Sequence, residues 1–416
     1  MKFSRKDTLI MLAIAALGML LRLTAILAYP SAPESDPLAY WQIASSFSSG
    51  NGLVWGDHPT AFYNLGYPVF LGTVLAVFGQ SLVVAKTTNV ILSALSILFI
   101  YIATLQLFKS RPAATVASIL FATYTESIVF ATYLAKENLM TTLLAAQIAL
   151  ISSYDPQSSG RTKILCAVAL GIIVGTLLLT GNSTLAFLPA LFIWGIRRSG
   201  TLREYAKFAL IATAAATLVV APLVYRNYVV FGAPVMNNNG GNNLYVGNFP
   251  GAGPFFPEGF PENTPLSKDF KQLYRDLGEY RMDKYMRDLA IQYILDDPKS
   301  ALRRMAVRAL TFWIPPIPTE GKLKSSGEAV LRFVWLAQYL IMFALFFCAL
   351  AQWRRYPAQL QLLCLLLLVY ALLHTPFTVG SRYRLPVMLL VAIGGGLGSM
   401  PVFRKLTTFS CSEPVR

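Results

Sequence analysis

The sequence predicts an all-α polytopic membrane protein with about ten transmembrane helices and a partly helical extracytoplasmic segment. Of its 416 residues, 55% are hydrophobic and only 13% are charged, and the mean hydropathy is +0.53. Soluble domains typically contain about 25% charged residues. The apolar residues also gather in long runs, and about 20 such residues suffice to cross a bilayer as a helix.

The candidate spans are apolar runs separated by short polar connections. They are 8–29, 82–107, 112–133, 137–153, 163–180, 185–196, 204–225, 329–351, 357–373 and 385–401. Several runs are short or ragged, so their number is approximate. The core of the first run, about 22 residues, exceeds the apolar region of a signal peptide, and we expect it to be retained as a helix.

Basic residues in the loops predict the orientation, because Lys and Arg near helix ends stay on the cytoplasmic side. With the N-terminus inside, every second loop is basic, whereas 30–66 and 180–184 contain no Lys or Arg. The basic loop residues are Lys109, Arg111, Arg161, Lys163, Arg197, Arg198, Arg203, Arg354, Arg355, Arg404 and Lys405. We therefore expect a protein of the cytoplasmic (inner) membrane with both termini cytoplasmic. The net charge of +15 follows from this topology and a basic outer segment, and it does not indicate nucleic-acid binding.

Three parts follow from this topology. Residues 1–225 form an N-terminal membrane module with a first outer loop at 30–66, residues 226–328 an extracytoplasmic segment, and residues 329–416 a C-terminal membrane module. The extracytoplasmic segment opens with a stretch rich in Asn, Gly and Pro, which predicts turns. It continues with apolar residues at helical spacing, and Pro298 predicts a break between two amphipathic helices at the membrane surface.

Ionisable residues collect on the outer side of the predicted bundle. They are Glu34, Asp36, Glu126, Lys136, Glu137, Arg226, His374, Arg382 and Arg384. An Asp can act as general base on a hydroxyl, and an Arg can bind phosphate oxygens bidentately. Such a set suits the activation of a hydroxyl beside a phosphate. Arg22 lies within the first span near its outer end, where we expect it to pair with an outer-loop acid or a lipid phosphate.

At these residues the sequence resembles the GT-C superfamily of glycosyltransferases that use polyprenyl-phosphate sugars. It is most similar to the bacterial relatives of the protein O-mannosyltransferases and of the lipid A aminoarabinose transferase. The resemblance rests on "DPLAYWQIA" with Asp36, Tyr40 and Ala44, on "PTAFYNLGYPVFLG" at 59–72, on "LAKENL" with Glu137 and on "RYRLP" at 382–386. It covers roughly the first 150 residues well and the remainder in outline.

The resemblance implies roles for particular residues. In the family an acid of the first outer loop is the catalytic base, and the matching position is Asp36. Basic residues of the outer loops bind the donor phosphate, which makes Arg382 and Arg384 candidates. Further candidates are Glu34 and Glu137 for catalysis and Lys136, Arg226 and Arg22 for the donor phosphate.

Two departures from the family leave questions open. The eukaryotic mannosyltransferases carry an Asp-Glu pair in the first loop, whereas Pro37 follows Asp36 here, so Glu34 either takes the second acid's role or only shapes the turn. The outer segment lacks a recognisable β-trefoil, which leaves a protein acceptor open. Glu137 can also have a purely structural role, since an acid that begins a helix complements the helix dipole.

Candidates for sugar or acceptor binding are Tyr40, Tyr67, His58 and Asn242. The tyrosines, with Trp41 and Tyr63, suit either stacking on sugar or the interfacial aromatic belt. Asn242 belongs to the Asn–Gly run at 237–243, which suits sugar hydroxyls and turns equally. A lone histidine such as His58 more often makes a hydrogen bond than does chemistry.

The predicted function is an integral membrane glycosyltransferase. It moves a sugar from a polyprenyl-phosphate donor to a hydroxyl of a glycolipid, polysaccharide or protein on the extracytoplasmic face. The transfer inverts the anomeric configuration of the sugar, and Asp36 acts as the base. The alternative is a flippase or transporter of a lipid-linked or small solute, but transporters place ionisable residues near the bilayer midplane. With two histidines and four cysteines we expect no metal site, although loop carboxylates can hold a divalent cation without a signature.

Overall fold

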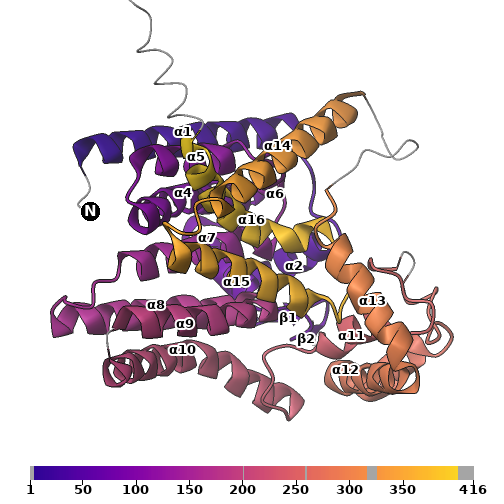
Figure 1. Cartoon of the computed structure of the whole chain (residues 1–416). Helices are drawn as coiled ribbons and strands as arrows, with labels where there is room; N and C mark the ends of the chain where they lie inside the picture. Colours follow the sequence, from indigo (N-terminus) through magenta and orange to yellow (C-terminus); the bar gives the residue numbers. More distant parts are fainter. Residues whose placement is uncertain (1–3, 200, 258–259, 316–325, 402–416) are drawn as a thin grey trace, which may run out of the picture.

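A computed structural model describes residues 4–199, 201–257, 260–315 and 326–401 (Figure 1). The elements in chain order are α1 (Arg5–Ala28), α2 (Asp36–Ser48), β1 (Val54–Trp55), β2 (His58–Pro59), α3 (Gly66–Phe78), α4 (Leu82–Phe108), α5 (Arg111–Ala122), α6 (Thr125–Phe130), α7 (Lys136–Ser153), α8 (Gly160–Thr180), the 3-10 helix η1 (Asn182–Ala186), α9 (Phe187–Ser199), α10 (Leu202–Phe231), α11 (Gly240–Asn248), α12 (Phe270–Asp296), α13 (Pro298–Thr311), α14 (Ser326–Leu350), α15 (Pro357–His374) and α16 (Ser381–Gly398). The expected all-α fold is confirmed. Within the described ranges, β1 and β2 form the one sheet, a short antiparallel pair.

Six of the described helices are long and apolar enough to cross a membrane, namely α1, α4, α8, α10, α14 and α15. The helices α3 and α5 are also apolar but shorter. The chain is therefore a multi-pass membrane protein, while the number of about ten spans stays a prediction. Arg404 and Lys405, which contributed to the predicted orientation, lie outside the described residues, as do residues 316–325 of the outer segment.

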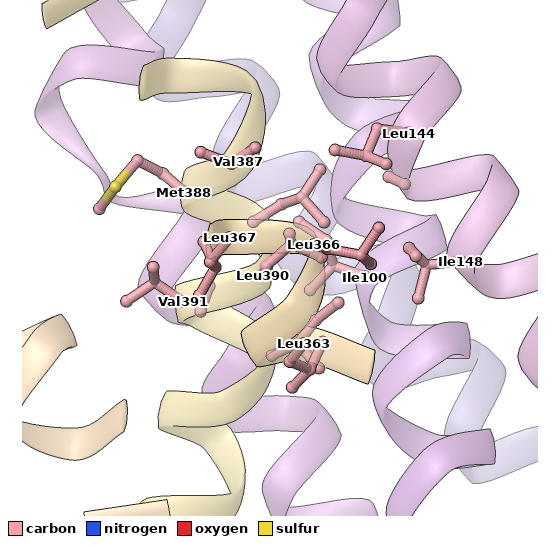
Figure 2. Close-up of a cluster of buried hydrophobic side chains, with 14 of the residues drawn as sticks. Ile100, Leu144, Ile148, Leu363, Leu366, Leu367, Val387, Met388, Leu390 and Val391 are labelled. Atoms are coloured by element: carbon pink, nitrogen blue, oxygen red, sulfur yellow. The ribbon is translucent and has the colours of Figure 1, made fainter. Parts of the chain in front are cut away.

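The core is a set of apolar side chains where helices from both ends of the chain meet. Figure 2 shows Ile100 of α4, Leu144 and Ile148 of α7, Leu366 of α15 and Leu390 of α16 within one cluster, and each is buried. The C-terminal helix α16 also packs closely on α5 at Gly396. A Cβ added there would lie 2.3 Å from the carbonyl oxygen of Ala113, so a larger residue would push the two helices apart.

The outer segment contains a helix where turns were expected. Residues 240–248 form α11, so this part of the prediction was wrong. The reason is tertiary, because the backbone N–H of Asn242 donates to Asp283 Oδ1 of α12 (2.8 Å) and so caps the helix start. Tyr245 and Val246 are then buried against α12.

Two helices on either side of Pro298 were expected, and α12 and α13 confirm them. Pro298 begins α13, and the Asp297 carboxylate caps that helix by accepting from the Ser300 N–H (3.1 Å). The apolar run at 112–133 differs from expectation, because it divides into α5 and the short helix α6.

Figure 1 shows α11, α12 and α13 together at one end of the helix bundle, close to β1 and β2. Backbone hydrogen bonds tie this outer segment to two loops. Asn238 N donates to Ala61 O in the first outer loop (2.7 Å), and Val379 N, just before α16, donates to Pro254 O (2.9 Å). Residues far apart in sequence are thereby brought to one end of the bundle.

Candidate active site

Asp36 lies at the first position of α2, followed by Pro37, which suits a helix start because proline lacks the N–H that would be unpaired there. The preceding residue, Ser35, has φ +54°, a conformation that costs a non-glycine residue about 1–3 kcal/mol. Asp36 accepts two hydrogen bonds, from Arg382 Nη1 to Oδ2 (2.6 Å) and from the Tyr63 hydroxyl to Oδ1 (3.1 Å). The first outer loop and α16 thus meet at this carboxylate.

Arg382 stands in the first turn of α16 and forms an ion pair with Asp36. Its second amino group, Nη2, donates to the Tyr383 hydroxyl (3.1 Å), and its guanidinium lies 5.0 Å from the centre of that ring. The side chains of Arg382 and Asp36 remain 43% and 24% exposed. Water therefore reaches both partners of the ion pair.

Lys136 and Glu137 begin α7 and add one charge of each sign. Lys136 Nζ donates to Asn64 Oδ1 (3.4 Å), and Asn64 Nδ2 donates to Asn182 Oδ1 (3.0 Å). Glu137 is only 4% exposed, and its carboxylate interacts electrostatically with both Lys136 and Arg382. We name Asp36, Tyr63, Lys136, Glu137 and Arg382 the open cluster.

Three tyrosines pack against one another beside Asp36. Tyr40 is buried and packs edge to face with Tyr63 and Tyr67, at ring-centre distances of 5.2 and 5.6 Å. Burial holds the pKa of Tyr40 well above its usual range, and the charges of Glu137 and Asp36 raise it further. Burial and the Asp36 charge also raise the pKa of Tyr63, so its hydroxyl stays protonated and donates to Asp36.

Tyr40 and Tyr67 were expected to bind sugar or acceptor. The structure buries both side chains. Tyr67 is fully buried, and its hydroxyl donates to Asn89 Oδ1 (3.1 Å). Tyr67 packs against Tyr40, and Tyr40 packs against Tyr63. Their role in sugar binding stays a prediction.

Arg384 lies away from Asp36, although it was expected to act with Arg382. It is 1% exposed, and its Nη1 donates to the carbonyl oxygens of Phe312 (2.7 Å) and Ile314 (3.0 Å). Its guanidinium lies 4.8 Å from the centre of the Tyr339 ring. Glu126, which interacts electrostatically with Arg384, is 2% exposed and accepts from the Tyr124 hydroxyl (2.7 Å). We name Tyr124, Glu126, Tyr339 and Arg384 the sealed cluster.

Arg22 and Arg226 are bonded to backbone. Arg22 is fully buried and donates to Ala122 O (2.8 Å), at the end of α5, and to Ser127 Oγ (2.8 Å). It therefore caps α5, whereas pairing with an outer-loop acid or a lipid phosphate was expected. Arg226 donates to Thr60 O (2.8 Å) and Leu53 O (2.9 Å), which fixes the first outer loop to α10.

The remaining candidates do not converge on Asp36. Glu34 is exposed two residues before it, and His58 is exposed in β2. Asn242 is buried in the first turn of α11, with its backbone held by Asp283. Their proposed roles stay predictions.

Two contacts in the open cluster were not expected from the sequence, that of Asn64 with Lys136 and that of Tyr63 with Asp36. Asn64 bonds to Lys136 and Asn182, yet neither asparagine was singled out. Tyr63 was noted only as an aromatic residue, and its bond to Asp36 was not foreseen. The signal available for Tyr63 and Asn64 was their position inside the stretch at 59–72 that carries the family resemblance.

Among the described residues, no group of three or more His, Cys, Asp or Glu side chains is placed to hold a metal ion. Positive charge at the open cluster comes from Arg382 and Lys136. A weakly bound divalent cation stays a prediction.

Two solved proteins share the fold of this chain at low sequence identity. The oligosaccharyltransferase of Archaeoglobus fulgidus, in the apo form and tethered to an acceptor peptide, matches with a TM-score of 0.54 and 14% identity, over 97% of this chain and 51% of that chain. ArnT from Cupriavidus metallidurans, bound to undecaprenyl phosphate, matches with a TM-score of 0.50 and 13% identity, over 95% of this chain and 78% of that chain.

At these identities the likeness establishes the fold. The chain spans about half the length of the oligosaccharyltransferase that it matches. No protein-family model matches the chain, and no curated protein sequence does either.

Proposed function

We propose that the protein is a membrane glycosyltransferase that moves a sugar from a polyprenyl phosphate to an acceptor hydroxyl at the open cluster. The observation that carries the proposal is the ion pair of Asp36 and Arg382 (2.6 Å), which joins an acid to a cation within reach of solvent. The fold shared with two glycosyltransferases supports it, as does the undecaprenyl phosphate bound by ArnT.

In the proposed reaction the donor phosphate binds Arg382 and Lys136. Because Arg382 then turns to the phosphate, the Asp36 carboxylate is released to accept the proton of the acceptor hydroxyl. The hydroxyl oxygen attacks the anomeric carbon, the bond from that carbon to the phosphate oxygen breaks, and polyprenyl phosphate leaves. A single displacement inverts the anomeric configuration. The two cations stabilise the charge that grows on the leaving phosphate, which needs no proton.

The Tyr63 hydroxyl keeps one oxygen of Asp36 oriented while the other takes the proton. Glu137 is the second acid of the cluster, and its charge holds Lys136 and Arg382 near the site. The positive-inside pattern supports an active site on the extracytoplasmic side of the inner membrane. The acceptor is a glycolipid, polysaccharide or protein.

The test is sugar transfer by the purified protein in nanodiscs, with a panel of radiolabelled undecaprenyl-phosphate sugars and isolated lipid, polysaccharide and protein fractions as acceptors. The variants are Asp36→Asn and, as matched control, Asp57→Asn, an exposed acid of the same loop. We expect wild type and Asp57→Asn to transfer, and Asp36→Asn to be slower by about 10²- to 10⁴-fold. Movement of the lipid across the bilayer without transfer from any donor would instead establish the flippase alternative.

A further inference from the structure

We propose that Glu279, in the outer segment, is a positioning residue that sets the place of Tyr63 and Asn64 in the open cluster. This inference rests on the function proposed above. Glu279 touches neither Asp36 nor Arg382 through any described hydrogen bond, and the proposal concerns how it acts on them through the first outer loop.

The Glu279 carboxylate accepts three hydrogen bonds. Its Oε2 accepts from the Thr60 hydroxyl (2.7 Å), and its Oε1 accepts from the Ala61 N–H (2.7 Å) and from Asn238 Nδ2 (3.0 Å). Bonds to a charged acceptor are about twice as strong as neutral ones. One side chain of α12 thus forms hydrogen bonds with two consecutive residues of a loop that lies more than 200 positions earlier in the chain.

A break in the backbone of α12 lies directly before Glu279. Gly278, directly before Glu279, has φ +69° and ψ 175° and breaks the helix. Residues with a side chain rarely adopt this conformation. The glycine therefore allows α12 to change direction at the point where its carboxylate meets the first outer loop.

Two further contacts hold the same two loop residues. Arg226 donates to Thr60 O (2.8 Å), and Asn238 N donates to Ala61 O (2.7 Å). The Thr60 hydroxyl donates a hydrogen bond to Glu279 and accepts one from the Phe62 N–H (3.0 Å). Glu279 therefore fixes the direction of the Thr60 hydroxyl, and that hydroxyl fixes the next turn of the loop.

The held residues lead directly to the open cluster. Tyr63 and Asn64 follow Ala61 by two and three positions, and they contact Asp36 and Lys136. A displacement of the loop at Ala61 is therefore passed to both contacts. A misplacement of about 1 Å in a catalytic arrangement can cost about 100-fold in rate.

The decisive variant is Glu279→Gln, since the amide is neutral and turns one acceptor into a donor, so that the three bonds cannot all be kept in their present directions. We expect transfer from the undecaprenyl-phosphate sugar panel to fall about 10- to 100-fold. Asp276→Asn, an exposed acid one turn earlier in α12, is the matched control and should keep the wild-type rate. Thr60→Val should behave like Glu279→Gln, and Thr60→Ser, which keeps the hydroxyl, should restore transfer.

A double-mutant cycle separates positioning from a general loss of structure. If Glu279 acts through Tyr63, the variant that combines Glu279→Gln with Tyr63→Phe should be about as slow as the slower single variant. Multiplication of the two single effects would overturn the inference.

Hydrogen exchange of the peptide at 58–64 provides a readout that does not depend on transfer. We expect faster exchange in Glu279→Gln and wild-type exchange in Asp276→Asn, because the group that holds Thr60 and Ala61 loses its charge and one of its two acceptor atoms. Faster exchange with an unchanged transfer rate would overturn the positioning role and leave the proposed function intact. Absence of transfer by wild type itself would overturn the proposed function, and the positioning role with it.

Discussion

The open and sealed clusters have similar chemistry and opposite surroundings. Each contains at least one acid, one arginine and at least one tyrosine, and the two arginines stand two residues apart in α16. Arg382 and Asp36 keep 43% and 24% of their side chains exposed, whereas Arg384 and Glu126 are 1% and 2% exposed. Under the proposed function, exposure to solvent is the property that makes the open cluster, and not the sealed cluster, the place of the reaction.

The partners of the two arginines reinforce this contrast. Arg384 is bonded to the carbonyl oxygens of Phe312 and Ile314, which link α16 to the end of the outer segment. A phosphate would have to displace these oxygens from a buried arginine. Arg382 is bonded to the carboxylate of Asp36, which is the base of the proposed reaction.

The largest expected contrast comes from removing each arginine in turn. Arg382→Ala should slow transfer by about 100-fold at unchanged thermal stability, because a preorganised charge on the leaving group is lost. Arg384→Met should lower the free energy of unfolding by about 1–3 kcal/mol for each buried carbonyl oxygen, of Phe312 and of Ile314, that loses its donor. Transfer per folded molecule and melting temperature measure the two effects. Equal losses of transfer in both folded variants would contradict the contrast.

Tyr63→Phe sharpens the account of the open cluster. The Asp36 carboxylate loses one donor, and we expect transfer to slow by about tenfold. Because the pKa of Tyr63 is raised, its O–H is retained as the pH rises, so the factor should be the same between about pH 6 and about pH 9. A pH–rate profile of wild type and variant is the measurement. A factor that disappears toward the alkaline end would show that the hydroxyl ionises in this range.

Lys136→Met gives the smallest expected effect in the open cluster. The amine bonds to Asn64 at 3.4 Å and acts on the phosphate beside the better placed Arg382, so we expect the KM for the donor to rise about fivefold. Steady-state kinetics with varied donor checks this. A fall in kcat at constant KM would indicate that Lys136 acts in the transition state alone.

The sequence was sufficient for the parts of the fold that depend on local pattern. Long apolar runs predicted the six helices that are long and apolar enough to cross a membrane, and Pro298 predicted the break between α12 and α13. It was insufficient at α11, where the cap comes from Asp283 in a later helix. A stretch rich in Asn and Gly has little preference for helix by itself, so only the tertiary partner decides.

The candidate site divides in the same way. Motifs selected Asp36 and Arg382, which lie 346 positions apart in the chain and which the fold joins. They could not separate Arg382 from Arg384, because both precede Pro386 in one short motif and exposure is set by packing against Phe312 and Ile314. Arg22 likewise finds its partners at the end of α5, which no local pattern indicates.

Sugar transfer by wild type, Asp36→Asn and Glu126→Gln, measured at equal amounts of folded protein, would decide whether the open cluster is the active site. One acid is taken from the open cluster and one from the sealed cluster. The account predicts transfer by wild type and Glu126→Gln and a loss of about 10²- to 10⁴-fold in Asp36→Asn. Transfer by Asp36→Asn at the wild-type rate would contradict it.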